Sequence, residues 1–168
     1  MRLRFTPIMK LELELIPEST WGKSLAQLLP KEVWDDLRRE VYDAFNHSCA
    51  ICGATDKQLH CHERWEFDDK KHIQRLVGFQ CLCVDCHEIK HWGRTVAEAH
   101  KSGNNDRLIY LTKHFCKVNN CSERIFTLHK VEIGDIFQLR SRYKYTVDFG
   151  KFRPDLVVKI WEEQRRKA

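Results

Sequence analysis

The chain has 168 residues, of which 42% are hydrophobic and 32% charged, and this composition excludes a disordered or collagen-like protein. No apolar run approaches the ~18 residues of a membrane span, and the N-terminus lacks the apolar stretch of a secretory signal, so we expect an intracellular, cytoplasmic protein. The net charge of +5 is ordinary for a soluble protein, but it also suits a polyanionic partner.

The predicted elements mix strands and helices. Residues 10–15 alternate apolar and charged side chains, which predicts a half-buried strand that Pro17 ends. Pro30 then opens a helix over residues 31–45, whose apolar side chains recur at helical spacing. The further elements follow in chain order: strands at 59–65 and 76–82, a helix at 83–92 stopped by Gly93, helices at 95–102 and 104–119, a strand at 137–149 and a helix at 154–167. This order predicts an α+β fold.

Eight cysteines in a chain without a secretory signal indicate metal binding more often than disulfides. Four of them form two Cys-x2-Cys pairs, Cys49 with Cys52 and Cys83 with Cys86, with 30 residues between the pairs. Each pair sets two thiolates on one side of a tight turn, and two such turns close a tetrahedron around zinc with S–Zn bonds of about 2.3 Å. Four cysteines leave no open position, so the predicted zinc is structural. The alternative is a set of reduced core thiols.

The other four cysteines carry weaker signals. Cys61 and Cys81 lie in predicted strands and are expected to be buried thiols. Cys116 and Cys121 have four residues between them, which is looser spacing than a zinc turn needs, so a second metal there stays open.

A histidine cluster is predicted beside the zinc site. His87 and His91 are one turn apart on the predicted helix 83–92 and face the same way, which is a common arrangement for holding a metal ion. The strand before them carries His62 and Glu63. Because the cysteine pairs flank both elements, zinc would bring the strand hairpin against the helix. We therefore expect His62 and Glu63 to lie near His87 and His91.

Together these motifs resemble the HNH endonucleases, most closely the zinc-stapled bacterial and phage proteins with a Cys-His-Glu-x-Trp strand. The resemblance covers roughly residues 33–118. It implies a ββα-metal fold, one catalytic divalent ion and hydrolysis of DNA phosphodiester bonds. Residues 31–119 would then be the HNH core with flanking helices, residues 1–30 an N-terminal strand and helix extension, and residues 120–168 a basic C-terminal strand-helix extension. The motifs that carry it are Cys49-x2-Cys52, Leu59-His60-Cys61-His62-Glu63-Arg64-Trp65 and Leu82-Cys83-x2-Cys86-His87-x3-His91.

The resemblance also implies roles for single residues. The first strand of the family carries a dipeptide in which one residue binds the metal and the other is the base. Aligning the apolar alternation gives His62 the metal and Glu63 the base, whereas a shift by one makes His62 the base and puts Cys61 at the ligand position. His87 and His91 complete the ligands of an ion that is Mn²⁺, Ni²⁺, Mg²⁺ or Zn²⁺. The family's middle Asn corresponds to Gly78, and Gln74 and Gln80 are the candidate substitutes for it.

DNA is the expected partner, and the oligomeric state, monomer or homodimer, stays open. Basic side chains are expected to hold the phosphates, and they fall into two groups. Arg64, Lys90 and Arg94 surround the motif, and Arg140, Arg142 and Lys144 share one face of the predicted strand 137–149.

Two other functions fit the same residues. One is a zinc-ribbon module that binds nucleic acid or protein without cutting, which the departure at Gly78 favours. The other is a zincin hydrolase, because His87-Glu88-Ile89-Lys90-His91 matches His-Glu-x-x-His literally. A zincin helix does not need a cysteine turn directly before its first histidine, so the context argues against the second alternative.

Overall fold

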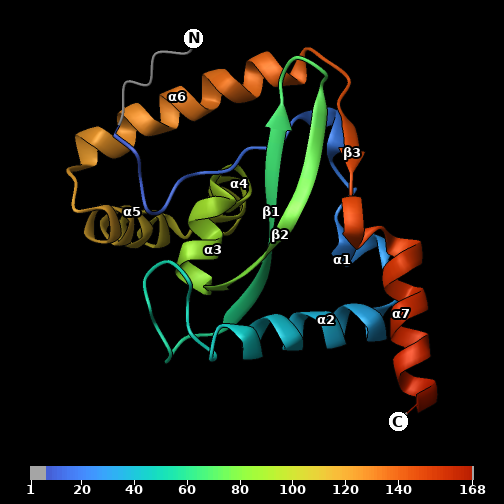
Figure 1. The fold of residues 1–168 in the computed structure, drawn as a ribbon. Helices are drawn as coiled ribbons and strands as arrows, with labels where there is room; N and C mark the ends of the chain where they lie inside the picture. The colour runs from blue at the N-terminus through green and yellow to red at the C-terminus, as the bar shows by residue number, and fades with distance from the viewer. Residues whose placement is uncertain (1–6, 168) are drawn as a thin grey trace.

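The computed structural model describes residues 7–167, and Figure 1 shows how their elements are arranged. Residues 1–6, on which the lack of a secretory signal mainly rests, lie outside this part of the chain. Within residues 7–167 a three-stranded sheet is packed against helices, so the predicted α+β class is confirmed. The helices are α1 (Leu25–Leu28), α2 (Lys31–Ala44), α3 (Val84–Lys90), α4 (Trp92–Ser102), α5 (Asn105–Asn119), α6 (Glu123–Ser141) and α7 (Pro154–Lys167), with 3₁₀ turns at Glu18–Thr20 and Gly150–Phe152.

The sheet is built around one long hairpin. Strands β1 (Leu59–Asp68) and β2 (Ile73–Cys83) pair antiparallel, and β3 (Thr146–Asp148) pairs parallel with β2 on its other side. The chain then passes from β2 directly into α3, so hairpin and helix are consecutive. Because β1 is an edge strand, side chains on both of its faces can reach the space beside that edge.

The hairpin contains a bulge at the position that the HNH resemblance gives to asparagine. Arg64 lies opposite Gly78, but the next residue, Trp65, lies opposite Leu76, so Val77 is left without a partner. Gly78 has a φ of +155°, a backbone conformation that residues with a Cβ rarely adopt. Glycine at this position therefore serves the shape of the hairpin.

The predicted strand at residues 10–15 is absent: this N-terminal segment is extended but pairs with no strand of residues 7–167. Its backbone groups bond to helix side chains instead. The Leu11 amide donates to Asn119 Oδ1 at 2.9 Å, and Asn119 Nδ2 donates back to the Leu11 carbonyl at 2.9 Å. The Leu13 amide donates to His129 Nε2 at 3.1 Å. The alternation was informative about burial, since Leu11 and Leu13 are buried, but not about pairing.

The predicted strand at 137–149 is also wrong over most of its length. Helix α6 continues to Ser141, and β3 covers Thr146–Asp148 alone. The helical spacing of apolar residues before position 137 explains why the helix continues. Phe126 is buried, and Ile133, two turns later on the same face, packs against the same core. The apparent alternation was produced by a helix end followed by a turn.

The helix predicted at 83–92 ends two residues earlier than expected, at Lys90. His91, with φ −94° and ψ 39°, separates α3 from α4, and Gly93 lies inside α4 instead of stopping a helix. The predicted helices at 31–45, 104–119 and 154–167 are confirmed to within one residue at each end.

Two apolar clusters hold these elements together. The first is formed by the N-terminal segment, the turn after α2 and helices α3, α5 and α6, and it includes Leu82, Ile89, Phe115 and Phe126. The second joins α1, α2, β2 and α7 around Leu25, Val33 and Leu76. The hairpin, α3 and the turn after α2 all contribute to the first cluster, and the predicted metal ligands lie on or next to these three parts of the chain.

Candidate metal centres

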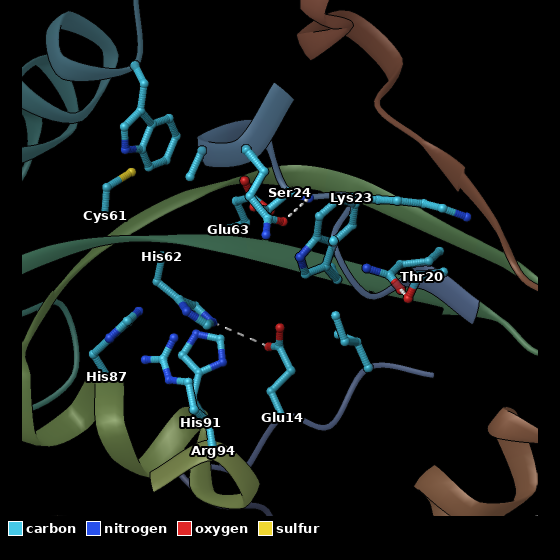
Figure 2. Close-up of a pocket in the computed structure, with 17 residues that line it drawn as sticks. Glu14, Thr20, Lys23, Ser24, Cys61, His62, Glu63, His87, His91 and Arg94 are labelled. Carbon is cyan, nitrogen blue, oxygen red and sulfur yellow. Dashed lines mark hydrogen bonds and ion pairs between the residues drawn. The ribbon is translucent and has the colours of Figure 1, made fainter. Parts of the chain in front are cut away.

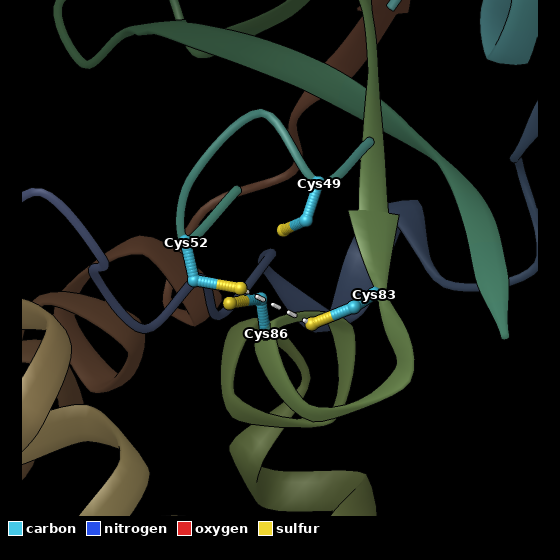
Figure 3. A group of neighbouring side chains, drawn as sticks. All are labelled: Cys49, Cys52, Cys83 and Cys86. Carbon is cyan, nitrogen blue, oxygen red and sulfur yellow. Dashed lines mark hydrogen bonds between the residues drawn. The ribbon is translucent and has the colours of Figure 1, made fainter. Parts of the chain in front are cut away.

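Four cysteine sulfurs meet where the turn after α2 contacts the start of α3. The Sγ atoms of Cys49, Cys52, Cys83 and Cys86 all lie within 4.8 Å of one another (Figure 3). The Cys52–Cys83 separation is 3.6 Å, close to the S–S distance of about 3.8 Å that a tetrahedron with ~2.3 Å Zn–S bonds requires. The four thiols could hold one metal ion, as the spacing of the two pairs predicted.

Backbone hydrogen bonds fix the first pair against the hairpin. The Cys49 amide donates to the Ala54 carbonyl at 2.9 Å, and the Gly53 amide donates to the Cys49 carbonyl at 2.9 Å. The Ala50 amide donates to the Cys81 carbonyl of β2 at 2.8 Å. Gly53 has a φ of +76°, which the tight turn requires. Main-chain hydrogen bonds thus position the turn that carries the sulfurs of Cys49 and Cys52.

The protonation of the thiols also fits a cation. Contacts with the Cys83 and Cys86 thiols hold the pKa of Cys49 below its usual value. The contact with Cys49 in turn raises the pKa of Cys83 to about 12, and it raises the pKa of Cys86 as well. One thiolate therefore suppresses ionisation of its neighbours, and a positive ion is needed to keep all four sulfurs ionised.

Groups around the sulfurs are already paired. His114 Nε2 lies 3.3 Å from Cys86 Sγ. Asp85, only 2% exposed, contacts Lys57 and accepts from Arg107 Nη2 at 2.7 Å and from the Tyr110 hydroxyl at 3.1 Å. Burial would raise the pKa of Asp85, but the two cations outweigh it and the pKa lies below its usual value. Although Asp85 and His114 lie within reach of Cys83, the carboxylate there needs no further ion.

Three imidazoles form a second cluster beside the four sulfurs. Ring nitrogens of His62 on β1, His87 on α3 and His91 at the end of α3 lie within 4.8 Å of one another (Figure 2). The ring centroids of His62 and His91 are 5.0 Å apart, and those of His87 and His91 are 4.6 Å apart. The predicted convergence of hairpin and helix is therefore found for these three residues.

A fourth imidazole belongs to the same cluster and was missed in the sequence. The ring of His60 stacks on His87 with centroids 4.6 Å apart and planes inclined by 8°. The period of two along β1 was the available signal, because it sets His60 and His62 on one face and Glu63 on the other.

The imidazoles are suited to bind a metal ion. Burial, followed by the neighbouring imidazoles, lowers the pKa of His87 to about 2, and burial and His62 lower the pKa of His91 to about 3. Both rings are thus neutral at pH 7, the form that ligates. Within the described residues, the Nε2 atoms of His60 and His62 are buried without a hydrogen-bond partner. Unpartnered buried nitrogens are uncommon in folded proteins, and a cation among them would supply the missing partner.

Glu14, from the N-terminal segment, faces this cluster. Its Oε2 lies 3.6 Å from His62 Nε2 (Figure 2), and it lies 3.8 Å from Lys90 Nζ. Burial would raise the pKa of Glu14, but its interaction with His62 and the charge of Lys90 outweigh it and hold the pKa below its usual value. No sequence pattern indicates this contact, because it depends on how the N-terminal segment crosses the molecule.

Glu63 points away from the imidazoles. Its Oε1 accepts a hydrogen bond from the Leu25 amide at 2.6 Å, at the start of α1. Burial raises the pKa of Glu63 to about 7, against the lowering effect of the Leu25 and Ala26 amides. We expected Glu63 to lie with His62 beside α3, but its side chain points toward α1 instead. Both residues nevertheless line one cavity of about 270 Å³ that surrounds the edge of β1.

The predicted phosphate-binding residues divide into two groups. Arg64 and Arg94 are exposed, and Arg94 lines the cavity, whereas Lys90 is 15% exposed and lies beside Glu14. Arg140, Arg142 and Lys144 do not share a strand face, because they fall at the end of α6 and in the turn after it.

Arg140 is engaged within the fold. Its Nε donates to Asp69 at 2.8 Å, and its guanidinium lies 3.8 Å from the ring centroid of Phe67. Only 16% of its side chain is exposed, so Arg140 ties α6 to the tip of the hairpin.

Side-chain contacts bear on the proposed substitutes for the family asparagine and on the zincin alternative. Gln74, a proposed substitute for the family asparagine, accepts from the Thr20 hydroxyl at 2.7 Å, while Gln80 lies opposite His62 in the ladder. Glu88, which would be the base of a zincin, accepts from Arg107 Nε at 2.8 Å and so faces α5. This pairing argues against the zincin alternative.

Searches against protein-family models, curated proteins and solved structures find no match to this chain. No helix within residues 7–167 combines the length and apolar character needed to cross a membrane. The functional assignment therefore depends on the site itself: a cluster of four thiols that could enclose one ion, and three imidazoles that leave coordination positions open.

Proposed function

We propose that this protein is a metal-dependent endonuclease that hydrolyses DNA phosphodiester bonds, as the HNH enzymes that its motifs resemble do. The observation that carries the proposal is the convergence of His62 from the hairpin with His87 and His91 from α3. Three protein ligands leave positions for water and substrate, as catalytic metal sites require. The adjoining thiol cluster supports the proposal because, holding zinc, it would fix the hairpin against α3.

The residues around the cavity can be given roles in phosphodiester hydrolysis. A divalent ion held by the three imidazoles would supply Lewis-acid stabilisation of the developing phosphate charge. Arg94 and Lys23, which line the cavity, would neutralise phosphate oxygens of the bound strand. Glu63 lines the same cavity and has a pKa of about 7, but its carboxylate would have to turn from the Leu25 amide toward the imidazoles to accept the proton of the attacking water.

A non-cutting zinc-ribbon module that binds nucleic acid is the second candidate. It is favoured by the departure at the family's asparagine position: Gly78 serves the bulge, and one of the two candidate substitutes, Gln74, bonds to Thr20. Both candidate functions use the thiol cluster. They differ in whether an ion at the imidazoles catalyses phosphodiester hydrolysis.

The test is plasmid nicking by the zinc-loaded protein with Mn²⁺, Ni²⁺ or Mg²⁺. We expect wild-type protein to nick DNA and His62→Ala and His87→Ala to lose about 100-fold or more in rate. His100→Ala, an exposed histidine on α4, is the matched control and should cut at the wild-type rate. Glu63→Gln should lose rate while still binding the second ion.

The outcomes separate the candidates. If clean wild-type protein binds DNA in a salt-sensitive manner but never cuts it, the protein is a binding module. Cleavage of peptides in place of DNA would support a zincin. Wild-type nicking rates in His62→Ala and His87→Ala would contradict the proposed metal centre directly.

A further inference from the structure

The N-terminal segment brings a carboxylate to the imidazole cluster from outside the region covered by the HNH resemblance. The Glu14 amide donates to the Lys90 carbonyl at the end of α3 at 2.9 Å. The bonds of Leu11 to Asn119 and of Leu13 to His129 fix the segment on either side of its path. Glu14 is therefore held at the cluster by main-chain contacts and is not a freely moving surface side chain.

Lys90 provides positive charge beside Glu14, but only near the limit of ion-pair distance. The Glu14 side chain is 17% exposed, and within the described residues the charged nitrogen paired with it is Lys90 Nζ, at 3.8 Å. Its other neighbour, His62 Nε2 at 3.6 Å, is a buried nitrogen without a hydrogen-bond partner. A cation bound at the imidazoles, with the other ring nitrogen of His62 as its ligand, would add positive charge beside the buried carboxylate and would leave His62 Nε2 to donate to Glu14.

We propose that Glu14 is the carboxylate of the imidazole centre, where it orients His62 and offsets the charge of a divalent cation bound by His62, His87 and His91. Glu14 is not part of the set of ligand atoms that lie within 4.8 Å of one another, so it acts through His62 as a positioning residue. Carboxylates that hold a ligating histidine in this way raise its basicity and fix its ring. The inference rests on the metal centre of the proposed function, but not on DNA cleavage.

The test is titration of Co²⁺ into full-length protein whose thiol cluster already holds zinc, followed by calorimetry and visible absorption. The variant Glu14→Gln keeps the shape and removes the charge, and Glu14→Asp restores the charge on a shorter side chain. Glu18→Gln, an exposed carboxylate just beyond the N-terminal segment, is the matched control.

We expect Co²⁺ to bind Glu14→Gln about 10–100-fold more weakly than wild type, with a changed absorption band. Glu14→Asp should recover part of the affinity, and Glu18→Gln should equal wild type. All four proteins should keep one zinc ion and the same thermal midpoint to within a few degrees, which separates the effect from a loss of folding.

Equal Co²⁺ affinity and an identical spectrum in Glu14→Gln and wild type would overturn the inference, as would wild-type protein that binds no Co²⁺ at the imidazoles. The two proposals fail differently. Co²⁺ binding that depends on Glu14, without DNA cleavage, would leave this inference standing and remove the nuclease. DNA cleavage with Co²⁺ binding indifferent to Glu14 would do the reverse.

Discussion

At the residue scale, Glu63 is a buried carboxylate whose ionisation opposes folding. The side chain is 8% exposed, and burial raises its pKa to about 7 from an ordinary value of 4.5. The folded state binds the Glu63 proton more tightly than the unfolded state does. Protonated Glu63 therefore contributes fully to the free energy of unfolding below the pKa of 4.5 that it has in the unfolded chain, and this contribution disappears as the pH rises through 7.

Glu63→Gln should remove this pH dependence. Between pH 5.5 and 8.5 we expect the free energy of unfolding of wild type to fall by about 2 kcal/mol relative to that of the variant. Urea unfolding of zinc-loaded protein across this range measures the difference. The control is Glu66→Gln, an exposed carboxylate on the same strand, which should track wild type. Parallel curves for wild type and Glu63→Gln would show that Glu63 is not buried as described.

At the element scale, the N-terminal segment depends on one side chain of α5. Leu11 is fully buried, and both of its backbone polar groups bond to Asn119. Asn119→Ala leaves them unpaired, so we expect a loss of about 1–3 kcal/mol in the free energy of unfolding and faster amide exchange in residues 10–15. Urea unfolding and hydrogen exchange measure these effects.

Asn105→Ala, an exposed position at the start of α5, is the control for that substitution and should change stability little. A stable Asn119→Ala protein with unchanged exchange at residues 10–15 would mean that the segment is held without Asn119, by its apolar side chains and its hydrogen bonds to His129 and Lys90.

The elements that the sequence predicted well are those with a strong local signal. The two strands of the hairpin were predicted at residues 59–65 and 76–82, within the observed strands, and α7 was bounded correctly by Pro154 and its basic last turn. Helix α6 was missed because the alternation at its C-terminal end was taken for a strand, while the helical spacing of Phe126 and Ile133, which pack against the same core, lies upstream of it. The N-terminal segment was misassigned for a similar reason: its partners are side chains from distant helices.

In the molecule as a whole, some residues of the candidate site could be predicted from the sequence and others could not. The cysteine pairs and His87 with His91 were predictable because chain spacing alone fixes their geometry. Glu14 was not, because it lies 48 residues before His62 and reaches it through tertiary packing. The direction of Glu63 was predictable in principle, since alternation along β1 opposes it to His62, but the family dipeptide suggested otherwise.

The most direct test of the two adjacent metal centres is an anomalous-scattering map from crystals of the full chain grown with Zn²⁺ and Mn²⁺. We expect two peaks per chain. One should lie at the centre of the four cysteine sulfurs, and the other within bonding distance of His62, His87 and His91. A single peak among the sulfurs, with the three imidazoles bare at saturating Mn²⁺, would contradict the account, and so would sulfurs without any ion.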